Sequence, residues 1–361
     1  MTLATNTPGA GSDSPTSRDA YARAGVDLAA RNNLVEDIKR IASRATRPEV
    51  LSSVGPFCSL FAIEGYDRPV IASSTDGVGT KLRIAMLMER YDTVGQDLVN
   101  HCVNDILTSG ADPLFFLDYV GSSQFADDRK LELIAGMTAA CNAVGCAFVG
   151  GETADMPDIY AAGDFDLVGF IVGAVEHQNV ISAARIREGD VLLALPSSGL
   201  HTNGYSLVRR IFGIGVGGDP SDDRAVLDRW HEELGATLGD ALLAIHRPYY
   251  HDLKPVLPRL HGFAHITGGG IIDNVPRILP PGVAAGIDAS TWRVPPLFSL
   301  IQREGGVSEQ DMYHTFNMGV GALIAVATDD ADAIAAQLPD AWRAGSIVRQ
   351  ADERRVIIQP A

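Results

Sequence analysis

The chain has 361 residues, and a length of this order favours two domains of roughly 180 residues over a single one. Its 29 lysines and arginines face 45 aspartates and glutamates, and the net charge of −16 argues against a surface that binds nucleic acid or anionic lipid. A nucleotide or sugar phosphate is still compatible with this charge, because backbone N–H groups, a lysine and a divalent cation hold phosphate locally.

Four cysteines are too few and too irregularly spaced for a disulfide framework, so we expect a reducing compartment. The N-terminal residues show no basic and apolar leader, and no run of about eighteen apolar residues occurs in the sequence. We therefore expect a cytoplasmic protein with no membrane partner.

Residues 1–18 are mostly Ser, Thr, Pro and Gly with little to bury, and we expect a disordered tail there. Helical and extended patterns then alternate, which predicts a first domain of mixed α/β structure over 19–176. Its predicted helices span 32–44, 93–109 and 127–144, and its predicted strands span 69–75, 114–120, 147–151 and 166–176.

A polar segment at 176–189 precedes a second domain, which we place at 177–361. This domain is again predicted to be mixed α/β. Its predicted helices lie near 203–213, 223–246 and 296–304, and its predicted strands near 190–196, 283–289, 316–328, 344–349 and 354–358.

Glycine-rich segments lie at four places where a predicted strand ends and a helix begins. Such junctions expose backbone N–H groups at the positive end of a helix dipole, which suits phosphate. A tight turn explains any one of them equally well, but four with polar neighbours favour a phosphate site. The Walker loop and the dinucleotide GxGxxG are both absent, which removes the usual NTPase and dehydrogenase motifs. The segments are DGVGTK (76–81), GGETADMP (150–157), PSSGLHTNGYSLVRR (196–210) and ITGGGIIDNVPR (266–277).

Charged side chains beside these glycines point to phosphate and metal chemistry. A lysine such as Lys81 can meet a phosphate, and an aspartate such as Asp76 can hold an ion that bridges phosphate oxygens. Asp105 interrupts an apolar helix face, so it lies either at the solvent edge or toward a polar site. Carboxylate ligands without a histidine or cysteine companion favour Mg²⁺ over zinc, and Glu152 is a further candidate ligand.

Among the histidines, His201 is best placed for chemistry, because it lies between glycines in a polar loop. The alternative is a loop histidine that bonds only to the backbone. His246 and His251 bracket a proline, and we interpret both as surface or packing residues.

The chain resembles the phosphoribosylformylglycinamidine cyclo-ligase family, also called aminoimidazole ribonucleotide synthetases. The similarity runs from about Tyr21 to the C-terminus, and its motifs are YARAGVD, RPEV, TDGVGTKLRIA, CVNDIL, PLFFLDY, GGETADMP, SSGLHTNGYSLVR, HITGGG, NVPR and FNMGVG. The resemblance implies a two-domain α/β ATP-binding fold and a homodimer in which the N-terminal domains build a shared β-barrel.

It also implies an ATP-dependent ring closure in de novo purine biosynthesis. ATP phosphorylates the formyl oxygen of formylglycinamidine ribonucleotide, and the amidine nitrogen then attacks that carbon and expels phosphate. The products are aminoimidazole ribonucleotide, ADP and phosphate. ATP and Mg²⁺ are the implied cofactors, and the need for a monovalent cation stays open.

The resemblance assigns residues of this chain to three kinds of contact and to catalysis. The implied ATP contacts are Lys39, Asp76, Gly77, Thr80, Lys81, Asn104 and Asp105. The implied substrate contacts are Ser198, Gly199, His201, Asn203, Gly268, Gly269 and Gly270. The implied metal ligands are Asp76, Asp105 and Glu152, and the implied catalytic residues are His201, Asp105 and Lys81.

Some positions depart from the family pattern. Pro56 and Cys58 stand where glycines are expected, and IHRPYYHD at 245–252 replaces a segment that tends to read PTRIYV. The alternatives are another ATP-using member of the superfamily, such as selenophosphate synthetase or thiamine-phosphate kinase, and a non-catalytic nucleotide-binding dimer. A non-catalytic dimer would be expected to lack the charged ligands, whereas Asp76 and Asp105 are both present.

Overall fold

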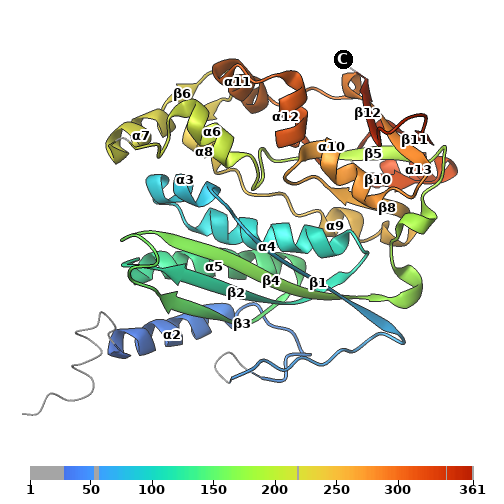
Figure 1. The fold of residues 1–361 in the computed structure, drawn as a ribbon. Helices are drawn as coiled ribbons and strands as arrows, with labels where there is room; N and C mark the ends of the chain where they lie inside the picture. The colour runs from blue at the N-terminus through green and yellow to red at the C-terminus, as the bar shows by residue number, and fades with distance from the viewer. Residues whose placement is uncertain (1–27, 53–56, 218, 339, 360–361) are drawn as a thin grey trace, which may run out of the picture.

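The computed structural model describes residues 28–52, 57–217, 219–338 and 340–359, and its two halves are each built on a β-sheet (Figure 1). The predicted tail and Pro56 lie outside the described residues. The first sheet has four strands in the order β1-β4-β2-β3, of which only β2 and β3 pair in parallel. Its strands are β1 (Pro69–Gly77), β2 (Asp112–Ser122), β3 (Ala147–Asp155) and β4 (Phe165–Glu176).

Helices α4 and α5 cover one face of this sheet. The two helices approach closely at two glycines, since a Cβ atom on Gly95 would lie 2.3 Å from the carbonyl oxygen of Leu133 and one on Gly136 would lie 2.1 Å from that of Asp92. Strand alternation points residues such as Phe116 toward the helices and leaves alternate residues on the outer face. The helices of the first half are α2 (Leu28–Ala42), α3 (Lys81–Met88), α4 (Asp92–Leu107) and α5 (Asp127–Val144).

The second half is built on a six-stranded sheet in the order β12-β9-β11-β5-β10-β8. Every residue of β10 is buried, in keeping with its apolar sequence VGALIAV. The strands of this half are β5 (Val191–Pro196), β6 (Trp230–His231), β7 (Ala236–Thr237), β8 (Leu260–His265), β9 (Val283–Asp288), β10 (Val320–Val326), β11 (Trp342–Arg349) and β12 (Val356–Gln359). Its helices are α6 (Tyr205–Phe212), α7 (Pro220–Leu227), α8 (Leu238–Leu242), α9 (Tyr250–Leu253), α10 (Gly270–Asn274), α11 (Pro296–Gly305), α12 (Glu309–Thr315) and α13 (Ala331–Ala335).

The predicted mixed α/β class is confirmed, but the long helix predicted at 223–246 is wrong. The chain forms α7, a short hairpin of β6 and β7, and then α8. Gly235 turns the hairpin with a φ of 62°, and Thr237 begins α8 by accepting a hydrogen bond from the Asp240 N–H. Strand β8 and the helices α3, α9, α10, α12 and α13 were not predicted. No helix in the described part of the chain is long and apolar enough to cross a membrane.

Helix α4 lies between the first sheet and the second half (Figure 1). Its polar side chains bind the backbone of residues 246–249. Asn100 donates to the carbonyl of His246 at 2.8 Å, and Asp97 accepts from the His246 N–H at 2.7 Å. Asn104 donates to the carbonyl of Arg247 and accepts from the N–H of Tyr249, both at 2.9 Å.

A buried ion pair reinforces the same contact. The amino group of Lys81 lies 2.6 Å from the carboxylate of Asp97, and both side chains are fully buried. The lysine also donates to the backbone carbonyls of Ala244 at 2.8 Å and His201 at 3.3 Å. All three of its N–H groups therefore have partners, two of them on the second half.

We expect Asp97→Asn to lower the free energy of unfolding by about 3–5 kcal/mol, because it leaves the Lys81 ammonium buried without a counter-ion. Urea unfolding followed by circular dichroism measures the change. Asp332→Asn, at a side chain that is 91% exposed, is the control and should change stability by less than about 0.5 kcal/mol. Equal stabilities of Asp97→Asn and the wild type would contradict this role of the ion pair.

Candidate active site at the junction of the two halves

A cavity of 470 Å³ opens where β1 and α4 of the first half meet β8 and α10 of the second. Most of its wall is polar, and acidic, imidazole and guanidinium groups all contribute. The first half supplies Ser73, Ser74, Thr75, Asp76, His101, Asp105 and Thr108. The second half supplies Phe263, Ala264, His265, Thr267, Asn274, Arg277 and Ile278.

Local geometry explains which side chains of the first half reach the cavity. Alternation along β1 turns Ser74 and Asp76 toward α4, while Ser73 and Thr75, which also border the cavity, are the more exposed residues of this stretch. On α4, His101 and Asp105 are four residues apart, so they lie one above the other on the same face.

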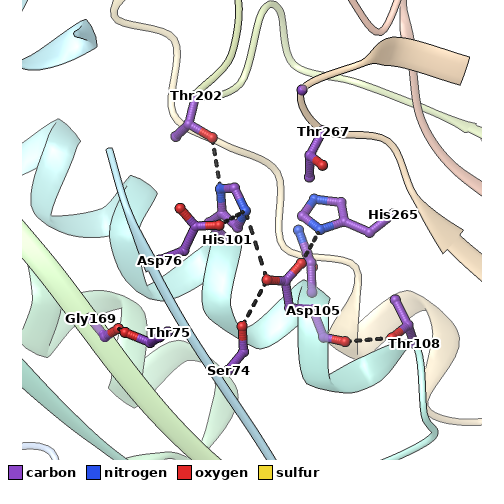
Figure 2. Close-up of polar contacts among 12 residues, drawn as sticks. Ser74, Thr75, Asp76, His101, Asp105, Thr108, Gly169, Thr202, His265 and Thr267 are labelled. Carbon is purple, nitrogen blue, oxygen red and sulfur yellow. Dashed lines mark hydrogen bonds and ion pairs between the residues drawn. The ribbon is translucent and has the colours of Figure 1, made fainter. Parts of the chain in front are cut away.

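Five side chains of the cavity wall form a connected network, and Figure 2 shows His101 at its centre. The Nε2 atom of His101 lies 3.0 Å from the carboxylate of Asp76 and 3.9 Å from that of Asp105. The other ring nitrogen of His101 lies 2.8 Å from the hydroxyl of Thr202. Asp105 also accepts from the Ser74 hydroxyl and from the Nδ1 atom of His265, both at 2.9 Å.

Hydrogen bonds and charges favour the ionised forms of three of these groups. Burial raises the pKa of Asp76, but the hydrogen bond from His101 and the charge of that histidine outweigh it and leave the pKa lowered. Burial also raises the pKa of Asp105, but the hydrogen bond from His265 and the charge of His101 outweigh it, and the pKa is lowered. Burial lowers the pKa of His101, yet the two carboxylates raise it above the ordinary histidine value. An imidazolium between two carboxylates is the preferred state.

Two further histidines extend the network into the protein. Because Asp105 is ionised and accepts from His265 Nδ1, the Nε2 atom of His265 accepts in turn from His246 Nε2, which lies 3.0 Å away. The His201 ring stacks on His246 at a centroid distance of 3.9 Å, and its Nε2 accepts from the Ser198 N–H. The Nδ1 atoms of His201 and His246 are buried and have no hydrogen-bond partner within the described residues.

Desolvation by burial lowers the pKa of both His201 and His246 well below the ordinary value, so both are neutral in the folded protein. In the unfolded chain such side chains titrate near a pKa of about 6.5. Below that pH the unfolded chain binds more protons than the folded one, so the free energy of unfolding falls as the pH falls.

We therefore expect His246→Gln, which removes one of these groups, to flatten the fall in stability below about pH 6.5 by up to roughly 1.4 kcal/mol per pH unit. Urea unfolding at about pH 7 and pH 5.5 measures the slope. His314→Gln, at a side chain that is 42% exposed, should keep the wild-type slope. A His246→Gln slope equal to that of the wild type would show that the buried imidazole is not kept neutral.

The structure brings together only part of the predicted ATP and metal set. Asp76 and Asp105 line the cavity, and Gly77 donates its N–H to Asp76 at 2.7 Å. Thr80 follows in the same loop, with its hydroxyl 3.0 Å from that of Ser206.

Two members of that set have other partners. Lys81 does not face the cavity, because it is fully buried against Asp97 and two carbonyls, so its predicted contact with phosphate needs correction. Asn104 is also fully buried, and its amide is committed to the backbone of Arg247 and Tyr249.

Lys39 and Glu152 lie away from the cavity within one copy of the chain. Lys39 is on α2, where it pairs with Glu36 at 2.8 Å. Glu152 is on β3, at the edge of the first sheet opposite β1. A metal ion held by Asp76 and Asp105 therefore does not reach Glu152 of the same copy.

The predicted substrate loops do meet each other. A Cβ atom on Gly268 would lie 3.0 Å from the side-chain oxygen of Asn203, so the loop at 197–204 adjoins the loop at 266–270. His201 holds a left-handed backbone with a φ of 60°. Its ring, however, is buried and does not line the cavity. Ser198 is exposed and donates its hydroxyl to the carbonyl of Ile245, and Gly199 accepts from the amide of Asn317.

The glycines at 268–270 have a structural role as well. Gly269 and Gly270 have φ angles of 91° and 58°, and a Cβ atom on Gly270 would lie 2.1 Å from the Tyr313 carbonyl oxygen. The Asn274 amide donates to the carbonyls of both Gly268 and Gly270 and so fixes the loop.

Sequence reasoning named only Asp76 and Asp105 among the residues of the cavity wall. Those it missed include His101, His265, Thr267 and Arg277. One signal was available, since the pair His101 and Asp105 has the i, i+4 spacing of a shared helix face. His246, interpreted as a surface or packing residue, is fully buried and part of the histidine network.

Two family models match most of the chain. The model of the N-terminal domain of AIR synthase related proteins matches residues 60–175, and that of the C-terminal domain matches residues 187–358.

Curated relatives are similar over most of their own length. The phosphoribosylformylglycinamidine cyclo-ligase of Desulfitobacterium hafniense is 47% identical over 326 residues, which cover 88% of this chain and 92% of the relative. That of Xanthomonas campestris pv. campestris is 46% identical over 347 residues, which cover 92% of this chain and 98% of the relative.

Solved structures with the same fold are more distant in sequence. Thiamine-monophosphate kinase from Stenotrophomonas maltophilia superposes with a TM-score of 0.62 at 17% identity, covering 89% of this chain and 94% of the kinase. Hydrogenase maturation protein HypE in complex with ATP superposes with a TM-score of 0.62 at 18% identity, covering 92% of each chain. These likenesses concern the fold alone, and with the family matches they confirm the predicted two-domain architecture.

Proposed function

The chain belongs to the phosphoribosylformylglycinamidine cyclo-ligase family, and we propose that it closes its substrate's ring in the cavity between its two halves. It is a cyclo-ligase of purine biosynthesis. One observation carries the placement: the motifs TDGVGTK, CVNDIL and HITGGG, far apart in sequence, supply Asp76, Asp105 and His265 to one cavity wall.

We propose the following reaction. The γ-phosphoryl group of ATP is transferred to the formyl oxygen of formylglycinamidine ribonucleotide, which turns a poor leaving group into a phosphate ester. The amidine nitrogen attacks the formyl carbon, the C–O bond breaks, and inorganic phosphate leaves with that oxygen. The nitrogen loses a proton, and aminoimidazole ribonucleotide, ADP and phosphate are released. Both steps depend on positioning and on neutralising phosphate charge.

Asp76 and Asp105 would hold the divalent cation that accompanies ATP. Their oxygens are the hard ligands that Mg²⁺ prefers, and when bound the ion supplies positive charge to the phosphates. The carboxylates fit this task because both face the same point at His101 Nε2 from different elements. Ser74 and His265 orient Asp105 through hydrogen bonds.

Arg277 and Thr267, at the other side of the cavity, are suited to the substrate's phosphate. Arg277 is exposed, and its guanidinium donates to the side-chain oxygen of Asn274 at 3.2 Å. A guanidinium binds phosphate through a charged fork of N–H donors. The ribose phosphate would therefore lie beside the loop that contains Gly268, Gly269 and Gly270.

We place His265 beside the substrate ahead of His201. His265 lines the cavity and is held by Asp105, whereas His201 lies behind His246. The contribution of His201 would be to keep the ring of His246 in place through stacking. Of these two histidines, only His265 can contact a substrate in the cavity.

The outer face of the first sheet is suited to a homodimer contact. Ile71 on β1 is 49% exposed and Phe170 on β4 is 42% exposed, although both are large apolar side chains. We propose that two copies join through this face, as in the barrel that the family resemblance implies. We also propose a cytoplasmic location, where all four cysteines, free in this structure, stay reduced.

Phe170→Asp is expected to convert the dimer to a monomer, because the pairing would bury the new carboxylate without a partner. Sedimentation velocity gives the mass in solution. The matched control is Trp230→Asp, at an apolar side chain that is 56% exposed on the second half, and it should stay dimeric. A monomeric wild-type protein would exclude the proposed dimer.

The cyclo-ligase activity is tested with formylglycinamidine ribonucleotide, ATP and Mg²⁺. We expect ADP release coupled one to one to formation of aminoimidazole ribonucleotide. Absence of substrate-dependent ADP release from the folded protein would contradict the proposed activity.

Asp105→Asn is expected to lower kcat by at least about 100-fold, because it removes a charge that holds the cation while keeping the shape of the side chain. Its melting temperature should stay near that of the wild type. Asp332→Asn is again the control, at a side chain that is 91% exposed. Wild-type turnover in Asp105→Asn would remove this carboxylate from the site.

A further inference from the structure

Thr202 joins the loop at 197–204 to the network around His101. It belongs to the second half, is 7% exposed, and brings its hydroxyl to 2.8 Å from the Nδ1 atom of His101 (Figure 2). The other ring nitrogen of His101 donates to Asp76, and an imidazolium donates from both nitrogens, so Nδ1 needs an acceptor. Thr202 supplies that acceptor from across the junction of the two halves.

The backbone of this loop determines where the hydroxyl lies. His201, directly before Thr202, has a left-handed backbone with a φ of 60°, which is unusual for a residue with a side chain. The carbonyl of His201 accepts from Lys81 of the first half at 3.3 Å and from the hydroxyl of Tyr205 at 3.2 Å. The position of the Thr202 hydroxyl is therefore set by the conformation of the loop.

The same loop carries implied substrate contacts. Asn203 donates its amide to the Thr202 hydroxyl at 3.4 Å. The side-chain oxygen of Asn203 adjoins the glycine loop, since a Cβ atom on Gly268 would lie 3.0 Å from it. A substrate that contacts Asn203 and the glycine loop therefore acts one residue away from the contact with His101.

We propose that Thr202 is a positioning residue whose hydroxyl holds the ring of His101 when substrate occupies the loop, and that it thereby couples substrate binding to Asp76 and Asp105. His101 Nε2 lies 3.0 Å from the first carboxylate and 3.9 Å from the second, so the ring helps to fix their orientation. A substrate that orders the loop fixes this arrangement in advance, and the nucleotide then binds at a lower cost in conformational entropy. This inference deepens the proposed function and rests on it, because that function places the cation of ATP at these carboxylates.

His265 also reaches across the junction, where its Nδ1 atom donates to Asp105 at 2.9 Å. It ends strand β8, and its Nε2 atom lies 3.0 Å from that of His246. Its place is thus set by a sheet strand and a buried ring, not by the loop at 197–204. Of these two contacts, that of Thr202 is the one suited to respond to substrate.

The test measures how two ligands affect each other's binding to the full-length protein. Isothermal titration calorimetry gives the Kd of a non-hydrolysable ATP analogue with Mg²⁺, with and without saturating formylglycinamidine ribonucleotide, and then the reverse. In the wild type we expect each ligand to tighten the binding of the other by about tenfold. Thr202→Val keeps the shape of the side chain without the hydroxyl, and it should reduce this factor to below about twofold, while each ligand alone binds within about threefold of the wild-type Kd.

Two further variants separate the hydroxyl from stability. Thr202→Ser keeps the hydroxyl and should keep the wild-type factor. Thr138→Val is the matched control, because Thr138 is also buried, at 4% exposure, and its hydroxyl donates to the Ile134 carbonyl within α5 at 2.7 Å. This control should lose stability as Thr202→Val does and should keep the wild-type factor.

A wild-type factor in Thr202→Val would overturn the proposal, as would its loss in Thr138→Val or in Thr202→Ser. Should Thr202→Val not fold, Thr202→Ala is measured against the same expectations. If the wild type binds both ligands without mutual tightening, the role of Thr202 is contradicted and the proposed function stands. If the wild type does not bind formylglycinamidine ribonucleotide, the proposed function is contradicted and this inference fails with it.

Discussion

A stripe of buried polar side chains along α4 holds the two halves of the molecule in place. Asp97, Asn100 and Asn104 all bond to the backbone of residues 246–249, and Asp97 also neutralises Lys81. Buried polar groups are costly unless each has its partner, so the halves cannot slide past each other without leaving several unpaired. The register of this contact sets the shape of the cavity.

The same helix also reaches the cavity. His101 directly follows Asn100 and Asp105 directly follows Asn104, so α4 serves the junction and the site with adjacent residues in the same two turns. An error of one residue in the packing of α4 would move both functions together. This coupling explains how a site assembled from distant segments can be held rigidly enough to position phosphate groups.

Charge in the site is balanced mostly within the protein. The two carboxylates are stabilised by His101, and the buried histidines beyond them stay neutral. Under the proposed function, such a site would attract a cation first and a phosphate through it, which would reconcile a net charge of −16 with binding of anionic substrates. Arg277 adds positive charge at the far side of the cavity.

Local patterns were enough to predict the longer helices, most of the strands and the mixed α/β class, and they singled out Asp76 and Asp105, which line the cavity. These features depend on neighbours in sequence: alternation in β1, the i, i+4 spacing in α4, and glycine turns. The failure at 223–246 has a local cause as well, since the turn at Gly235 was outweighed by the helical pattern on either side.

The partner of Lys81 and the contacts of the histidines could not be predicted from local sequence patterns. A lysine beside a glycine loop looks the same in sequence whether it meets a phosphate or an aspartate sixteen residues further along the chain. His101, His246 and His265 come from three segments, and the contacts of His101 with Thr202 and of His265 with Asp105 form only when the halves dock. Sequence patterns determine local conformation and residue chemistry, whereas burial and the choice of partner depend on contacts between distant segments, which form only in the folded chain.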